Sequence, residues 1–196
     1  MKKLFVILGK SSTGKDSILK YLIKYHEDSL YKIIPYTTRP IRSNEVNGKD
    51  YNFVTEEQMN NLKSYIIETR CYDSYMGGKV YYFTVIDDAF YNSNKNGIII
   101  GTLESLKSFK EKLADKLEIV PIYITVDDYT IISRSIEREK SNEGTNYKEI
   151  CRRFIADCED FSDERLKEAG INRGNTFKNY SFSTCTKLIE NYMGIG

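Results

Sequence analysis

Gly9-Lys10-Ser11-Ser12-Thr13-Gly14-Lys15-Asp16 is the stretch that decides the fold, since it follows the apolar run Leu4-Phe5-Val6-Ile7-Leu8 and opens a helical pattern. A buried strand that runs through a glycine loop into a helix gathers backbone N–H groups and the positive end of the helix dipole around one point, where an anion binds. The G-x-x-x-x-G-K spacing is that of a phosphate-binding P-loop. The residues that we predict to bind the phosphates of a nucleotide are Gly9, Ser11, Ser12, Thr13, Gly14, Lys15, Asp16 and Ser17.

Lys15 is the lysine of the G-x-x-x-x-G-K pattern. Its side chain can reach the outer phosphates of a nucleotide, so we predict that it acts in catalysis. The next position ordinarily carries a Ser or Thr whose hydroxyl holds Mg²⁺, but here it is the carboxylate Asp16. The alternative reading of the whole stretch is an ordinary glycine-rich turn between a strand and a helix.

Length and charge limit the possible functions. A chain of 196 residues is long enough for one compact domain with an inserted lobe. With 29 Lys and Arg against 28 Asp and Glu, the formal net charge is +1, and nothing global favours nucleic acid or membrane as a partner. The four cysteines show no C-x-x-C pairing, no secretory signal pattern precedes the first strand, and the apolar runs are only strand-length. We therefore expect a cytoplasmic protein.

Hydrophobic periodicity predicts an α/β fold. Helical stripes alternate with apolar strand-length runs, which favours a parallel sheet of the P-loop NTPase type with helices on both faces. The predicted strands are 4–8, 31–36, 65–68, 79–85, 98–101, 117–126 and 179–183. The predicted helices are 15–25, 55–62, 103–113, 128–139, 147–169 and 187–192, with a helical turn at 87–91.

A second polar segment, Thr37 to Val54, also has the residues of an anion site. Arg39 and Arg42 carry planar forks that can hold a phosphate through two hydrogen bonds each, and Tyr51 can add a phenolic O–H. A solvated charged loop is the alternative interpretation.

The pattern of this segment resembles guanylate kinase. It is Thr-Thr-Arg-Pro-x-Arg-x-x-Glu-x-x-Gly-x-Asp-Tyr-x-Phe-Val, a short interval after a P-loop. The resemblance implies that the P-loop binds ATP and that Arg39, Arg42 and Tyr51 hold the phosphate of GMP, with Glu45 orienting them. It implies a single kinase domain with a core of 1–34, 86–135 and 150–196, an inserted small β/α GMP-binding lobe of 35–85 and a helical lid at about 136–149.

The resemblance also implies a base pocket. Glu68 would accept hydrogen bonds from guanine N1 and N2, and Tyr82 and Thr84 would lie on the O6 side. A carboxylate accepts from guanine but repels the N1 acceptor of adenine. This chain departs from the family pattern with Phe83 in place of glycine, a longer interval after Glu68, and Pro35 in place of a serine that contacts the base.

The metal site departs from the family as well. Guanylate kinases carry acidic residues at the end of the strand that here runs from Ile98 to Gly101, whereas this chain has Gly101-Thr102. Our hypothesis is that Asp16 supplies part of the charge that organises Mg²⁺, directly or through a water molecule.

Arginines flank the predicted lid. Phosphoryl transfer needs cations that arrive as water leaves. The resemblance assigns this role to Arg138 and Arg153, which match the family pattern better than Arg134 and Arg152 do.

The function that follows is ATP-dependent phosphorylation of GMP to GDP with Mg²⁺, in a monomer or homodimer whose partners are nucleotides. Three alternatives remain: a kinase for another nucleoside monophosphate or a ribose bisphosphate, whose relatives can also carry Gly-Lys-Asp; a non-catalytic guanylate-kinase-like module that binds phosphopeptides; and a nucleotide-binding regulator with negligible turnover.

Overall fold

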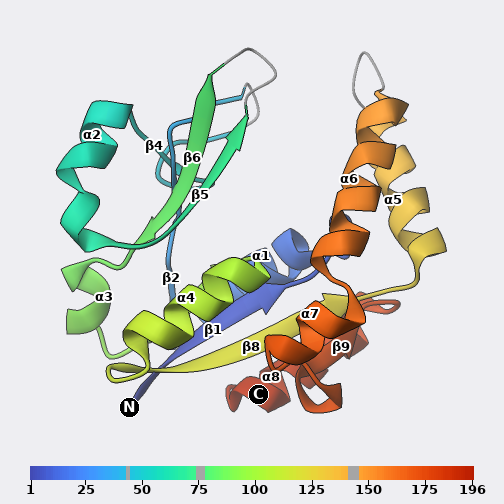
Figure 1. Cartoon of the computed structure of the whole chain (residues 1–196). Coiled ribbons are helices and arrows are strands. Elements are labelled where there is room, and N and C mark those ends of the chain that lie inside the picture. The colour runs from blue at the N-terminus through green and yellow to red at the C-terminus, as the bar shows by residue number, and fades with distance from the viewer. Residues whose placement is uncertain (43–44, 74–77, 141–145) are drawn as a thin grey trace.

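A five-stranded parallel sheet forms the centre of the molecule (Figure 1), a computed structural model that describes residues 1–42, 45–73, 78–140 and 146–196. Its central strand, β1, pairs with β7 on one side and β8 on the other. In spatial order the strands are β2 (Leu30–Lys32), β7 (Asn96–Ile100), β1 (Lys2–Leu8), β8 (Leu117–Thr125) and β9 (Thr176–Lys178).

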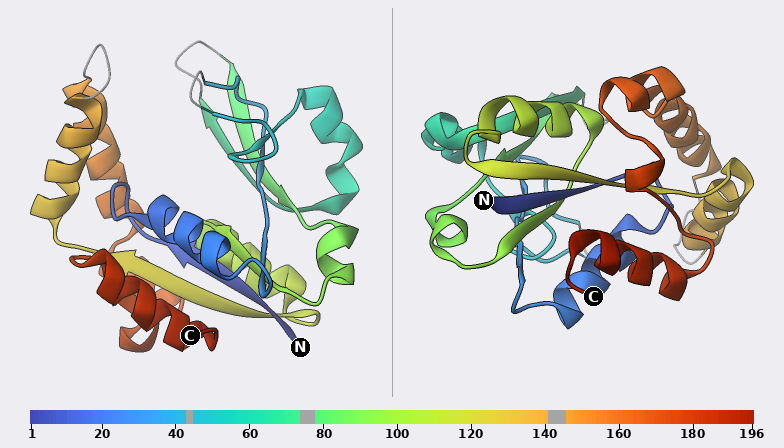
Figure 2. Two further views of the ribbon diagram at one scale, coloured as in Figure 1. Left: turned by 180° about the vertical axis from the view of Figure 1, so that it is seen from behind. Right: turned by 90° about the horizontal axis from the view of Figure 1, so that it is seen from below.

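Helices cover both faces of this sheet (Figure 2), because β1 is apolar on both sides. Leu4, Val6 and Leu8 pack towards α4 (Leu103–Leu113) and α7 (Asp163–Glu168). Phe5 and Ile7 pack towards α1 (Lys15–Tyr25) and α8 (Phe182–Met193). A strand buried on both faces is what the continuous apolar run predicts, and the predicted fold class is confirmed.

A smaller mixed sheet lies within the expected lobe 35–85. Its strand order is β4 (Asn52–Phe53), β3 (Tyr36–Thr37), β6 (Lys79–Val85) and β5 (Ile66–Asp73). Next to it are α2 (Glu56–Asn61), η1 (Lys63–Tyr65) and α3 (Asp88–Asn92). The predicted helix start at Thr55 is confirmed, since Thr55 and Gln58 form a complete capping box.

Two further helices, α5 (Asp128–Lys140) and α6 (Tyr147–Asp160), rise beside the core on the same side as the small lobe (Figure 1). The polar centre of the predicted lid, residues 141–145, lies outside the described residues. Within the described parts of the chain, none of the helices is long and apolar enough to cross a membrane.

Four element predictions named here were wrong in their bounds. The run 31–36 is not one strand: β2 and β3 belong to different sheets, because the segment around Pro35 carries the chain from the core to the lobe. The helix expected at 147–169 breaks near Ser162, whose hydroxyl caps α7. The last strand is Thr176–Lys178 rather than 179–183, and Ser181 is the N-cap of α8, which therefore begins at Phe182 instead of 187.

Candidate active site

The P-loop connects the end of β1 to the start of α1 and needs its two glycines. Gly9 has φ 145°, and a Cβ there would lie 2.2 Å from the carbonyl oxygen of Ile124. Gly14 has φ 93°, and a Cβ there would lie 2.4 Å from Asn179 Nδ2. Any larger residue would therefore push the loop away from β8 or from the segment after β9.

Lys15 is half-buried beneath this loop. Its Nζ donates to the carbonyl oxygen of Lys10 at 2.7 Å, and Thr13 Oγ1 donates to the same oxygen at 2.9 Å. Burial lowers the pKa of Lys15, while the carboxylates of Asp16 and Asp157 act in the opposite direction. The ammonium group is thus held close to the loop, with two carboxylates in its field.

Two side chains that sequence reasoning missed support the loop from outside. The buried Asn179 donates from Nδ2 to the carbonyl oxygen of Thr13 at 2.8 Å. Ser135 of α5 donates to Ser12 Oγ at 2.8 Å, and Ser12 has a left-handed backbone with φ 60°. A polar residue directly after a strand of the parallel sheet was the one sequence signal for Asn179.

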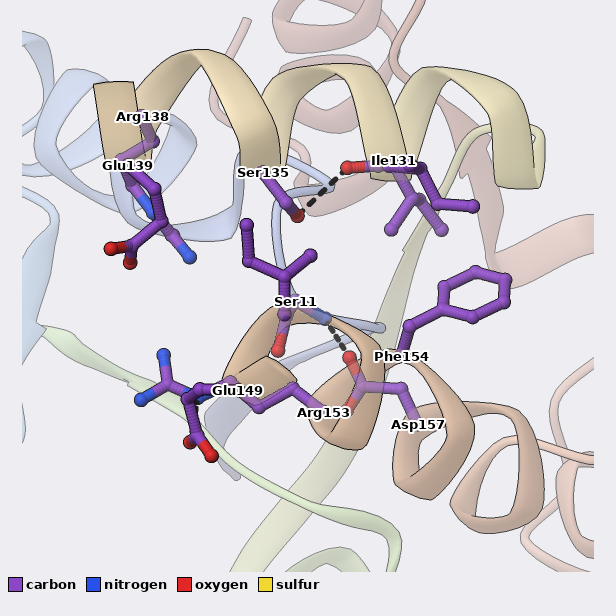
Figure 3. A pocket seen from close by; sticks show the side chains of 11 residues that line it. Ser11, Ile131, Ser135, Arg138, Glu139, Glu149, Arg153, Phe154 and Asp157 are labelled. Atoms are coloured by element: carbon purple, nitrogen blue, oxygen red, sulfur yellow. Dashed lines mark hydrogen bonds and ion pairs between the residues drawn. The ribbon is translucent and has the colours of Figure 1, made fainter. Parts of the chain in front are cut away.

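A third missed residue, Asp157 of α6, contacts the phosphate-binding face. The Ser11 amide donates to Asp157 Oδ2 at 2.5 Å (Figure 3). P-loop amides bind anions, so this carboxylate occupies one of the hydrogen bonds that a phosphate would use.

The Arg39 guanidinium is fixed in orientation by Glu45. Nη2 and Nη1 donate to the two carboxylate oxygens at 2.8 and 3.0 Å, and the Arg42 amide donates to Glu45 at 2.9 Å. The hydrogen bonds from Arg39 lower the pKa of Glu45 despite its partial burial.

Aromatic residues complete the surroundings of Arg39. Nε donates to the Tyr82 hydroxyl at 2.9 Å, and the guanidinium carbon lies 5.7 Å from the Tyr51 ring centroid and 5.5 Å from that of Phe53. Arg42 is exposed and lines the same cleft. The tertiary structure therefore brings together Arg39, Arg42, Glu45, Tyr51 and Tyr82, which we call the arginine cluster.

Glu68 and Thr84 lie behind the cleft surface. They are cross-strand neighbours on β5 and β6, and Thr84 Oγ1 donates to Glu68 Oε1 at 2.7 Å. Arg70 donates to both carboxylate oxygens, from Nε at 3.1 Å and from Nη2 at 3.2 Å. Among the described residues, Arg70 lines the cleft, whereas Glu68 and Thr84 are not part of its lining.

One cleft, with a volume of about 530 Å³, is lined by residues of the P-loop, of the small lobe and of α6. Lys15 and Asp16 line it from the P-loop, the arginine cluster lines it from the small lobe, and Asp157 lines it from α6. Two groups of cations thus face one space from opposite sides. Such an arrangement can hold two phosphorylated ligands towards each other.

Asp16 fits a magnesium site of the usual kind. It is exposed in the first turn of α1 and lines the cleft. Mg²⁺ is usually held by one or two carboxylates together with substrate phosphates and waters. A Cβ on Gly101 would lie 2.6 Å from Ser105 Oγ and 2.9 Å from Val6 Cγ1, so a carboxylate side chain at that strand end would displace its neighbours. Within the described residues, no cluster of three or more His, Cys, Asp or Glu could hold a metal.

The lid arginines differ in their environments. Arg138 and Arg153 line the narrow space between α5 and α6 (Figure 3). Arg153 and Arg152 both pair with Glu149 at 2.7 Å, and these bonds, that from Arg152 foremost, lower the pKa of Glu149 to about 2. Arg134 donates instead to the Asn179 carbonyl oxygen at 2.9 Å.

Fold and site together define a protein of the P-loop NTPase type with two groups of cations on one cleft. The family model for guanylate kinase matches residues 1–152. The chain belongs to the guanylate kinase family, as the resemblance of the sequence motifs predicts.

Curated relatives match mainly over short stretches. The chain is 43% identical to a guanylate kinase of Schizosaccharomyces pombe over 60 residues, 31% of this chain and 30% of that protein. It is 25% identical to a guanylate kinase of Chlamydia caviae over 154 residues, 75% of this chain and 70% of that one. It is 47% identical to protein lin-2 of Caenorhabditis elegans over 58 residues, 30% of this chain but only 6% of that protein. For the first and third of these, the match spans less than a third of the relative's length.

A solved structure agrees over nearly the whole chain. The crystal structure of guanylate kinase from Anaplasma phagocytophilum matches with a TM-score of 0.63 and 18% identity, covering 98% of this chain and 85% of that one. At this identity the match establishes the fold.

Proposed function

We propose that this protein transfers a phosphoryl group from ATP to GMP, forming ADP and GDP. The observation that carries the proposal is the single cleft lined by Lys15 of the P-loop and by the Arg39–Arg42–Tyr51 group. Membership of the guanylate kinase family supports a kinase reaction between two nucleotides.

Positioning and charge stabilisation would supply most of the catalysis. The acceptor is already an anionic phosphate oxygen, so no side-chain nucleophile or general base is needed. Lys15 and the loop amides would hold the ATP phosphates, and Arg39, Arg42 and Tyr51 would hold the acceptor phosphate in line with them. Arg138 and Arg153 would stabilise the transferred group. Mg²⁺, when bound, neutralises charge on the ATP phosphates, and Asp16 is the residue that would hold it.

The rate of ADP release in a coupled assay tests this proposal directly. GMP, dGMP, AMP, CMP and UMP should be compared as acceptors, with ATP and Mg²⁺ in excess. We expect turnover with GMP to exceed turnover with the pyrimidine nucleotides. A protein that turns over none of these acceptors would contradict the proposal. If another acceptor were preferred, that nucleotide would replace GMP as the proposed substrate.

A binding module without turnover is the second candidate. The observation that favours it is the contact between Asp157 and the Ser11 amide, because a carboxylate there opposes a nucleotide phosphate. Calorimetric titration separates the candidates: a kinase binds both ATP and GMP, whereas a module of this kind binds a phosphorylated ligand at the arginine cluster and binds ATP weakly.

A further inference from the structure

The part of β5 that lines the cleft carries a cation, Arg70, that the motif analysis did not identify. Arg70 stands directly opposite Tyr82 in the strand register, and the Tyr82 hydroxyl accepts from Arg39. Direct neighbours on antiparallel strands have Cα atoms about 4.5–5.5 Å apart. Arg70 therefore lies one strand away from the group expected to hold the acceptor phosphate, and it lines the same cleft.

The carboxylate of Glu68, behind Arg70, already accepts hydrogen bonds on both of its oxygens. The Glu68 side chain is only 2% exposed, against 19% for Arg70. Glu68 Oε1 accepts from Thr84 and from Arg70, and Oε2 accepts from Arg70. Swinging Arg70 away would leave a buried carboxylate without its counter-ion, which is costly. Glu68 thus positions Arg70.

Arg70 has hydrogen-bond donors left for a ligand. A guanidinium carries five N–H donors in a planar fork, and the pairing with Glu68 uses donors on Nε and Nη2 only. Tyr72, which also lines the cleft, is a further hydrogen-bond partner of Arg70. The cleft surface at this point is therefore rich in donors, so it selects ligands with adjacent hydrogen-bond acceptors.

We propose that Arg70, positioned by Glu68, selects the acceptor nucleotide by donating to the O6 and N7 atoms of guanine. The inference rests on the proposed function, because it takes GMP as the ligand of this side of the cleft. Arginine pairs with guanine O6 and N7 in just this bidentate manner. Adenine presents an N6 donor beside N7, which would face a second donor.

Analogues that differ by one group separate recognition by Arg70 from recognition by Glu68. IMP keeps O6 and N7 but lacks the 2-amino group that a carboxylate would read. The 7-deaza analogue of GMP keeps N1, N2 and O6 but lacks N7. We expect the wild-type protein to accept IMP nearly as well as GMP, and to discriminate against 7-deaza-GMP by about 10-fold and against AMP by about 100-fold.

Variants then assign the discrimination to the side chain. Arg70→Lys keeps the charge next to Glu68 but loses the planar fork, and Arg70→Met with Glu68→Gln avoids a buried unpaired carboxylate. Both should lose the preference for GMP over 7-deaza-GMP, mainly through KM. Arg173→Lys, at an exposed arginine of η2 (Arg173–Asn175) outside the cleft lining, is the matched control and should keep it.

Both Kd and kcat/KM should be measured for each nucleotide, because binding does not depend on turnover. A protein that binds GMP with the expected preference but does not transfer phosphate contradicts the proposed function and supports the role of Arg70. Equal binding of GMP and 7-deaza-GMP, with IMP about 100-fold weaker, would overturn the inference in favour of Glu68. Failure to bind any of the four nucleotides at this site would also overturn it.

Discussion

The proposed phosphate side and the proposed base side of the cleft are built differently. On the phosphate side, cations come from two recognisable motifs: Lys15 follows the P-loop glycines, and Arg39 is oriented by Glu45 six residues later. On the base side, the carboxylate expected to face the ligand is buried, and Arg70 faces the cleft instead. The comparison teaches that the cations of the P-loop and of the arginine cluster can be located from local motifs, whereas the motifs do not tell which of Glu68 and Arg70 reaches the cleft.

Lys15→Ala tests the phosphate side most severely. It removes the charge directed at the transferring group, so we expect kcat to fall by about 10²–10³-fold. Steady-state kinetics with GMP measure the effect. Lys24→Ala, at an exposed lysine on the same helix, is the control and should retain the wild-type rate. An active Lys15→Ala enzyme would show that the ATP phosphates are held elsewhere.

Arg39→Lys tests the other anion site. Lysine keeps the charge but loses the fork that contacts Glu45 and Tyr82, so kcat/KM for GMP should fall by about 10–100-fold. Both KM and kcat should change, because a loosely held acceptor misses the in-line geometry. Unaltered acceptor kinetics would place the second anion site outside the arginine cluster.

Asp16→Asn tests the metal hypothesis. The neutral amide is a weaker ligand for Mg²⁺, so the Mg²⁺ concentration that gives half-maximal activity should rise by about 10-fold. A magnesium titration of the initial rate at saturating ATP measures it. Asp28→Asn, at an exposed carboxylate beyond the end of α1, is the control. A midpoint unchanged from wild type would remove Asp16 from the metal site.

Asp157→Asn should improve nucleotide binding rather than weaken it. The substitution removes the negative charge that competes with a phosphate for the Ser11 amide, and the Kd for ATP should fall by about 2–10-fold. Calorimetric titration without GMP measures this. Glu159→Gln, at an exposed carboxylate of the same helix, should leave the Kd unchanged. Weaker ATP binding in Asp157→Asn would mean that the carboxylate supports the loop for nucleotide rather than opposing it.

Glu149→Gln should change the acid limb of the stability profile by the smallest amount. The folded pKa of Glu149 is about 2, below its ordinary value of 4.5, so its ion pairs contribute fully above about pH 4.5 and are lost as the pH falls towards 2. The pairs are partly exposed, and we expect an effect below about 1 kcal/mol. Urea unfolding at pH 7 and pH 3 should show a smaller difference in the variant than in the wild type. An identical pH dependence in both would show that the pairs with Arg152 and Arg153 do not stabilise the fold.

Much of the fold could be predicted from the sequence, because interactions between residues close in the chain determine it. The continuous apolar run of β1, which is buried on both faces, and the capping boxes at Thr55 and Thr102 depend on neighbouring residues only. The predictions were wrong where a contact between residues far apart in the chain determines the local structure. The segment after β9 reads as a strand, but Asn179 leaves the sheet and binds the Thr13 carbonyl oxygen instead.

The residues of the candidate site could be predicted from the sequence only where they belong to a motif. The P-loop motif identified Lys15 and Asp16, and the second motif identified Arg39, Arg42 and Tyr51. The family resemblance implied one shared site, and all five line one cleft. Asp157 and Asn179 could not be placed there from the sequence, because they lie 146 and 166 residues from the loop groups that they bind.

By itself, the sequence determined the P-loop, the second anion motif and the α/β class, since glycine conformations, charge spacing and apolar periodicity act over a few residues. Only the tertiary structure decided which of Glu68 and Arg70 reaches the cleft. Glu68 and Arg70 are two residues apart on one face of β5, and their order in the chain does not say which is buried. Packing against Thr84 covers the carboxylate, and the longer arginine covers it in turn and reaches the surface.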